Sequence, residues 1–281
     1  MKKKIRIWLL MGVALVLLGG IIFGATALIA KGDLTKMSVN NCITNEYTVN
    51  EAFESVTVLT KDAKVEILPA KDGVCRVSCY EEESLRHTVT VKEGVLTVSV
   101  EDERKWYEYI GFHLNAPKVT VYLPEKEYAS LRVENKTGDI QVRELCAETL
   151  TVTTTTGKIL LENVTCGGDI TTDFLTGGTH FKNVTCESLT AEGGTGGVTL
   201  ESTRARGKVT VKTNTGDVTL LSSDAETLEI KTNTGDVTGD LLSPKIFIPK
   251  TNTGDTTLPE TTTGGVCKIT TNTGDIEIKI Q

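Results

Sequence analysis

Four aspartates stand at the same place in a heptapeptide that the chain repeats, and their spacing suggests a metal site. The stretch KTNTGDV fills residues 212–218 and returns with at most two substitutions at 231–237, 250–256 and 270–276, so that its aspartates are Asp217, Asp236, Asp255 and Asp275. If the copies stack about 4.8 Å apart, the carboxylates repel one another, and a Ca²⁺ ion bridging their oxygens would relieve that repulsion. The alternative is a plain turn motif without a cofactor, because Asn, Gly and Asp all favour turns and the lysines of the motif neutralise the aspartates.

The seven cysteines all follow residue 30 and suggest a second kind of site. Cys146, Cys166 and Cys186 are 20 residues apart, which matches one repeat and predicts that they stack in one column. Neighbours in such a column lie within the roughly 4.4–6.8 Å between Cα atoms that a disulfide needs, and the alternative is a column of buried thiols. Cys75 and Cys79 share one strand face too far apart to pair. The three histidines are scattered, which indicates no metal site beside these cysteines.

An aromatic cluster is the third candidate site. The stretch RKWYEYIGFHL at residues 104–114 holds Trp106, Tyr107, Tyr109 and Phe112 in a chain with only 5% aromatic residues. Aromatic side chains on a loop can bind a sugar, a peptide or the membrane interface. The alternative is that they cover the open end of the core.

The glycine of the heptapeptide reveals the element that positions these residues. Glycines recur every 19 or 20 residues, at Gly138, Gly157, Gly177, Gly196, Gly216, Gly235, Gly254 and Gly274. Mostly apolar residues stand seven and five positions before these glycines and two after them, a spacing by two that is typical of strands. The period predicts an all-β fold, a parallel β-solenoid of about 19–20 residues per coil over residues 129–281.

The segments on either side of the repeat complete the predicted β structure. Residues 51–128 alternate polar and apolar residues and are expected to form a β region continuous with the solenoid. Residues 31–50 are expected to be a stalk or linker. The last strand, 275–281, has no coil after it, so its unpaired edge predicts a homo-oligomer through the C-terminal coil.

The N-terminus predicts a membrane anchor. Residues 1–6 form a basic cytoplasmic tail, and residues 7–30 contain no charge and are long enough to span a bilayer, which needs about 20 residues of helix. A cleaved signal peptide is the alternative. Either way, the remaining chain is expected outside the cytoplasm. Taking four basic residues from 30 leaves 26 against 37 acidic ones, a net charge of −11 that argues against nucleic acid as a partner.

Several motifs together resemble a known family. FESVTV at 53–58, KVEILPA at 64–70, KVTVYLP at 118–124 and SLRVENKTGDIQV at 130–142, followed by the TGD coils, resemble bacterial envelope proteins called "putative adhesins" with β-strand repeats, or toast-rack domains. The resemblance implies a right-handed β-helical ectodomain behind a membrane helix, and a surface or envelope-stress role. It implies no catalytic residue, and the cysteines depart from the family's pattern.

The function expected from the sequence is therefore that of a surface module and not of an enzyme. The chain is predicted to be a single-pass membrane protein whose extracytoplasmic solenoid binds a cell-envelope polymer or protein, in adhesion or envelope-stress sensing. One alternative is a β-helical enzyme acting on polysaccharides, although such an enzyme needs long loops around a cleft, and the coil length varies by only one residue. The other alternative is a self-assembling structural scaffold.

Overall fold

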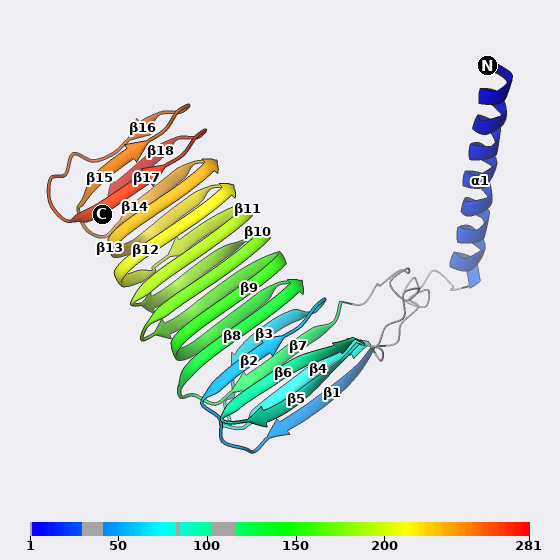
Figure 1. Ribbon diagram of the computed structural model, residues 1–281, viewed down its shortest axis with the longest axis horizontal. Helices are drawn as coiled ribbons and strands as arrows, with labels where there is room; N and C mark the ends of the chain where they lie inside the picture. The colour runs from blue at the N-terminus through cyan, green and yellow to red at the C-terminus, as the bar shows by residue number, and fades with distance from the viewer. Residues whose placement is uncertain (1, 30–41, 83–84, 103–115) are drawn as a thin grey trace.

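The chain folds into one N-terminal helix followed almost entirely by strands (Figure 1). The structure, a computed structural model, describes residues 2–29, 42–82, 85–102 and 116–281. Helix α1 spans Lys2–Ile29 and contains the uncharged segment Ile7–Ala25. The strands are β1 (Cys42–Val49), β2 (Ser55–Leu59), β3 (Lys64–Pro69), β4 (Cys75–Glu82), β5 (Leu85–Lys92), β6 (Val95–Asp102), β7 (Lys118–Leu123), β8 (Glu127–Thr137), β9 (Ile140–Cys166), β10 (Asp169–Cys186), β11 (Ser188–Glu201), β12 (Arg204–Thr215), β13 (Val218–Thr234), β14 (Val237–Leu241), β15 (Lys245–Lys250), β16 (Thr256–Thr257), β17 (Gly265–Thr270) and β18 (Ile276–Ile280).

The coils stack as parallel strands, and this confirms the predicted solenoid. Leu150 on β9 pairs with Leu131 on β8 and with Ile170 on β10, and the same column continues through β11, β12 and β13. Most of the coil strands bury every second side chain, so the columns of Leu, Val and Ile form one continuous core. Each coil is stabilised by its neighbours, because one coil alone cannot bury its own apolar face.

The repeated heptapeptide bonds to its own copy in the neighbouring coil. Its first threonine is buried, and its hydroxyl donates to the carbonyl of the glycine one coil away, 3.1 Å from Thr213 Oγ1 to Gly196 O and 3.0 Å from Thr232 Oγ1 to Gly216 O. The amide of Gly216 in turn donates to Thr234 O at 2.8 Å. Every copy therefore needs the same residues in order to match the next copy, which explains why the motif is repeated.

The last coil in the sequence is not the last coil in space. Strand β17 pairs with β13 on one side and β15 on the other, and β18 pairs with both β14 and β16. The coil made by β17 and β18 is therefore inserted between two coils that precede it in the chain. The prediction that residues 275–281 form the exposed end is wrong, because the β15–β16 coil covers the start of β18, and Ile276 and Ile278 are buried.

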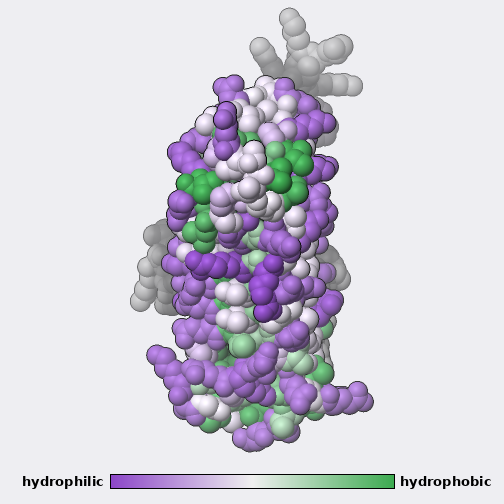
Figure 2. All heavy atoms as spheres, turned by 90° about the vertical axis from the view of Figure 1, so that its left-hand side faces the viewer, coloured by the Kyte–Doolittle hydropathy of each residue, from purple (hydrophilic) through white to green (hydrophobic). Residues whose placement is uncertain are grey.

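The coil that does end the solenoid is poorly suited to pairing with another chain. Strand β15 contains Pro249, which has no amide hydrogen to donate, and β16 has only two residues. Figure 2 looks onto this end of the molecule, where hydrophilic atoms cover most of the surface and apolar patches lie between them. Ile246 and Ile248 of β15 contribute to the exposed apolar area. Oligomerisation through the C-terminal coil stays a prediction. The open edge of residues 275–281 that suggested it is covered in part by β16.

The N-terminal β region joins the solenoid by the same kind of insertion. Strand β2 pairs in parallel with β6 and β8, and β3 pairs with β7 and β9, so the β2–β3 coil lies between two coils that follow it in the chain. Beyond these coils, β4 pairs antiparallel with β7 and with β1. The predicted linker 31–50 is thus wrong for its second part, because residues 42–49 form β1; residues 31–41 lie outside the described residues.

Candidate functional site

The aspartate column is confirmed in register, and its carboxylates bond to the backbone. Asp217 Oδ1 accepts a hydrogen bond from the amide of Asp236 at 2.9 Å, Asp236 Oδ1 from Asp275 at 2.8 Å, and Asp275 Oδ1 from Asp255 at 2.8 Å. Asp275 lies between Asp236 and Asp255, because the β17–β18 coil is inserted between the coils that carry them. One oxygen of each of these three acceptors is therefore engaged by the next corner, which gives the aspartates a structural role. Calcium binding by the column stays a prediction.

The cysteine column includes two of the three predicted members. Cys166 and Cys186 are buried on neighbouring coils, whereas Cys146 is exposed, and all three are free thiols. The spacing of 20 residues misplaces Cys146 because the coil between Gly138 and Gly157 has only 19, so Ala147 takes the inward position and Cys146 points outward. Burial raises the pKa of the Cys166 thiol to about 11 and that of Cys186 to about 12. Both thiols are therefore protonated and unreactive at neutral pH.

The predicted aromatic surface of Trp106, Tyr107, Tyr109 and Phe112 lies outside the described residues. Its role in binding stays a prediction.

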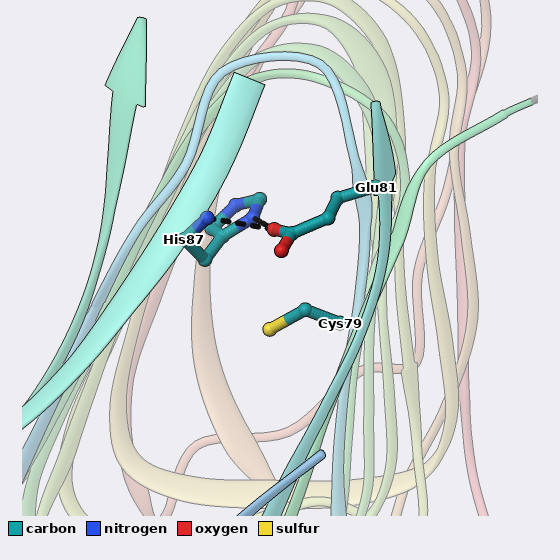
Figure 3. Close-up of side chains that lie close together, drawn as sticks. All are labelled: Cys79, Glu81 and His87. Atoms are coloured by element: carbon teal, nitrogen blue, oxygen red, sulfur yellow. Dashed lines mark hydrogen bonds and ion pairs between the residues drawn. The ribbon is translucent and has the colours of Figure 1, made fainter. Parts of the chain in front are cut away.

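A buried polar cluster that the sequence did not predict lies in the N-terminal β region (Figure 3). Cys79, Glu81 and His87 each offer a metal-ligating atom, all within 4.8 Å of one another, and no other such group of three occurs in the part of the chain that the structure describes. The expectation of scattered histidines is wrong for His87. Cys79 and Glu81 lie two residues apart on one face of β4. The next strand, β5, pairs antiparallel with β6 and places His87 opposite them.

Hydrogen bonds hold the cluster in place. Glu81 Oε2 accepts bonds from the amide and from Nδ1 of His87, each at 2.6 Å, and Glu81 Oε1 accepts a bond from Asn45 Nδ2 at 2.6 Å. The other ring nitrogen, His87 Nε2, lies 2.9 Å from Thr60 Oγ1. Burial, with the Glu81 carboxylate beside it, raises the pKa of the Cys79 thiol to about 12. The arrangement orients an imidazole, a carboxylate and a thiol toward one point.

A surface groove runs over the ends of β3 and β7 and the first corner of β9. Two adjoining hollows, of about 550 and 450 Å³, share Leu68, Pro69, Arg143 and Glu144 as lining residues. We call them together the β3–β9 groove. The register places the end of β3 between β7 and β9, since Pro69 pairs with Leu123 and Ile67 pairs with Val142. The groove follows from this register, because β3 and β7 end here and β9 makes its first corner beside them.

Cations of the β3–β9 groove are held by neighbouring groups. Arg143 Nε lies 3.1 Å from Glu162 Oε2, on the next coil. The Arg76 guanidinium hydrogen-bonds to Asp72 and lowers the pKa of that carboxyl, and it lies 5.9 Å from the centre of the Tyr122 ring. Lys126 Nζ donates to the carbonyl of Phe53 and lies 4.7 Å from the centre of its ring. The groove thus presents charged side chains of both signs next to apolar side chains, an arrangement typical of binding sites. Its cations are Lys71, Arg76, Lys126 and Arg143, and its carboxylates are Asp72, Glu125, Glu127 and Glu144.

An apolar N-terminal helix followed by a parallel β-solenoid defines the general class of this protein. More specifically, the chain belongs to the Toastrack DUF4097 family, whose model matches residues 53–281, and this confirms the resemblance to bacterial toast-rack proteins. No curated protein matches the chain.

Solved structures with the same fold come from bacteria. A "putative adhesin" from Bacteroides fragilis has a TM-score of 0.51 and 16% identity over 85% of this chain and 97% of that one. A "putative lipid binding protein" from Parabacteroides distasonis has a TM-score of 0.50 and 14% identity over 86% of this chain and 98% of that one. At these identities the likeness shows the fold alone.

Proposed function

We propose that this protein is a single-pass membrane protein whose β-solenoid binds a cell-envelope polymer or protein outside the cytoplasm. The observation that carries the proposal is helix α1. Its 19-residue segment Ile7–Ala25 has a mean hydropathy of 2.5 and buries none of its surface against the rest of the protein. Apolar surface of this extent is stable in a bilayer and costly in water. The basic residues before the segment favour a cytoplasmic N-terminus.

Binding without catalysis is the activity that the solenoid supports best. Most of the described coils are joined by tight corners, residues 258–264 between β16 and β17 being a longer connection, and the β3–β9 groove is an open hollow on the outside of the stack. Its charged side chains form ion pairs and cation–aromatic contacts with their neighbours. The two proteins of similar fold are described by their names as an adhesin and a lipid binding protein, which supports a binding role.

The location is testable with a cysteine that the protein already has. Cys146 is exposed, whereas the thiols of Cys75, Cys79, Cys166, Cys186 and Cys267 are buried with raised pKa values. A membrane-impermeant maleimide added to intact cells is expected to label Cys146, because it lies on the extracytoplasmic surface. Mass spectrometry of the digested protein identifies the labelled cysteine.

The variant Cys146→Ser is the control for this experiment and is expected to lose the rapid label at position 146. Mass spectrometry separates this label from any label on Cys42, which is half-buried. Denaturation should expose the buried thiols in both proteins and so show that equal amounts are present. Labelling of Cys146 only after the cells are made permeable would place the solenoid in the cytoplasm and contradict the proposal.

The binding surface is testable with two arginines in similar pairs. Arg143 lines the β3–β9 groove and pairs with Glu162, whereas Arg206 lies far along the solenoid and pairs with Glu187 at 2.8 Å. Arg143→Glu is expected to weaken binding of the purified protein to cell-envelope fractions at least about tenfold, because a reversed charge in a binding site costs more than 1.4 kcal/mol. Arg206→Glu should bind like the wild type. Equal binding by all three proteins would exclude the groove as the binding surface.

A further inference from the structure

The Cys79–Glu81–His87 cluster lies apart from the β3–β9 groove and has no part in the proposed binding. Figure 3 shows the Glu81 carboxylate against the His87 ring, with the Cys79 sulfur beside the pair. Cys79 and Glu81 are completely buried, and His87 is 2% exposed. Burying a carboxylate and an imidazole together is costly unless they are paired or bind a metal. Glu81 and His87 are paired with each other, and the Cys79 thiol beside them adds the third atom that could bind a metal.

The strands around the cluster make it rigid. Strand β4, which carries Cys79 and Glu81, is paired with β1 along its whole length and with β7 over residues 76–80. Strand β5, which carries His87, is paired with β6 from end to end. Side chains on paired strands hold their positions better than side chains on loops, and a metal site requires such preorganisation.

The hydrogen bonds around the cluster match those that support metal ligands in proteins. A histidine ligand binds the metal with one ring nitrogen, and the other nitrogen hydrogen-bonds to a neighbour that fixes the tautomer. Here His87 Nδ1 faces Glu81 and Cys79, while Nε2 meets the Thr60 hydroxyl at 2.9 Å. The ligating carboxylate is also held, because its second oxygen accepts the 2.6 Å bond from Asn45.

We propose that Cys79 Sγ, Glu81 Oε2 and His87 Nδ1 bind a divalent transition-metal ion of the zinc class. A thiolate with an imidazole selects such an ion over Ca²⁺ or Mg²⁺, which prefer oxygen ligands. On binding, the Cys79 thiol releases its proton to the solvent. The imidazole proton moves from Nδ1 to Nε2, and this N–H then donates a hydrogen bond to Thr60 Oγ1. The three residues leave the fourth position of a tetrahedral ion to a further ligand.

Cobalt substitution tests the site directly. The full-length protein is purified in detergent and unfolded in a denaturant that contains a chelator and a reductant. The chelator is then removed and the protein is refolded with Co²⁺, because the buried site is accessible only while the chain folds. A thiolate bound to Co²⁺ gives a charge-transfer absorption that oxygen and nitrogen ligands do not give. We expect this absorption to saturate at one ion per chain, and Zn²⁺ to displace the Co²⁺. Absence of the absorption from refolded wild-type protein would overturn the proposal.

Matched variants identify the cysteine. Cys79→Ser is expected to lose the thiolate absorption and to bind Zn²⁺ at least about tenfold more weakly in competition with a coloured chelator. Cys186→Ser is the control, because Cys186 is equally buried, with a thiol pKa that is also raised to about 12, but it lies on β10 away from the cluster. An unchanged absorption in Cys79→Ser, or its loss in Cys186→Ser, would contradict the assignment. Should Cys79→Ser fail to refold, His87→Gln is used, and it should retain a thiolate absorption with at least about tenfold weaker affinity.

Discussion

Replacing Gly196 with alanine is expected to destabilise the solenoid by more than about 4 kcal/mol, which is an exceptional loss for one methyl group. Gly196 has φ +142°, a backbone conformation that residues other than glycine rarely adopt. A Cβ atom at this position would lie 2.2 Å from the carbonyl oxygen of Gly177, on the neighbouring coil. The strands on either side are hydrogen-bonded and cannot move apart without breaking the ladder. Denaturant unfolding followed by circular dichroism measures the loss.

The matched control is Gly94→Ala. Gly94 also has a positive φ, +76°, but a Cβ atom there would meet no atom within 4 Å. This variant should lose only the cost of the left-handed conformation, about 1–2 kcal/mol. Equal losses in the two variants would show that the close carbonyl contact at Gly196 has no effect on stability.

The second large change in stability is expected at Phe174 and Gly193, which replace the repeated threonine in two neighbouring coils. The column that holds Thr154 and Thr213 has Phe174 and Gly193 in the coils between them. Phe174 is 1% exposed, and a Cβ atom on Gly193 would lie 2.1 Å from the Phe174 ring. The ring therefore fills the space that the missing side chain of Gly193 leaves, so the two residues compensate for each other in volume.

A double-mutant cycle measures this compensation. Phe174→Thr alone should cost about 3–5 kcal/mol, because it leaves a cavity above Gly193. Gly193→Thr alone should cost about 1–3 kcal/mol or more, because the new side chain collides with the ring. The double variant restores the threonine column between Thr154 and Thr213 and removes both the cavity and the collision. Its loss should be at least about 2 kcal/mol smaller than the sum of the single losses. Additive losses would contradict the compensation.

The regular part of the fold was predictable because each residue of a column has the same environment. The positions of Leu150, Ile170 and Leu189 relative to their glycines were enough to place them in one ladder. The order of the coils was not predictable in this way. Ile276 fits equally well beside Val237 or beyond Thr256, because every coil presents the same column to either neighbour. The period sets the register and says nothing of the sequence in which coils stack.

The candidate sites show a similar division. The aspartate column follows the period, so its register was predicted, but the backbone bonds of its carboxylates depend on corner geometry that the sequence does not state. Cys146 was misplaced because one 19-residue coil shifts a 20-residue spacing by one position, which turns a side chain to the other face. His87 meets Cys79 and Glu81 through antiparallel pairing outside the repeat, where no period gives the register. The signal in the sequence was the pair of strands on either side of Glu81, which can bring Cys79 and His87 to the same place.

The insertion of the β17–β18 coil between two earlier coils has a consequence for biogenesis. The chain is synthesised from its N-terminus, so the segment 245–257 leaves the ribosome before the residues that separate it from β13 and β14. A stack that grew strictly in the order of synthesis would place β15 directly on β13 and close the position that β17 occupies. Folding of this end therefore waits for the synthesis of β17 and β18, which must enter between two coils that are made before them.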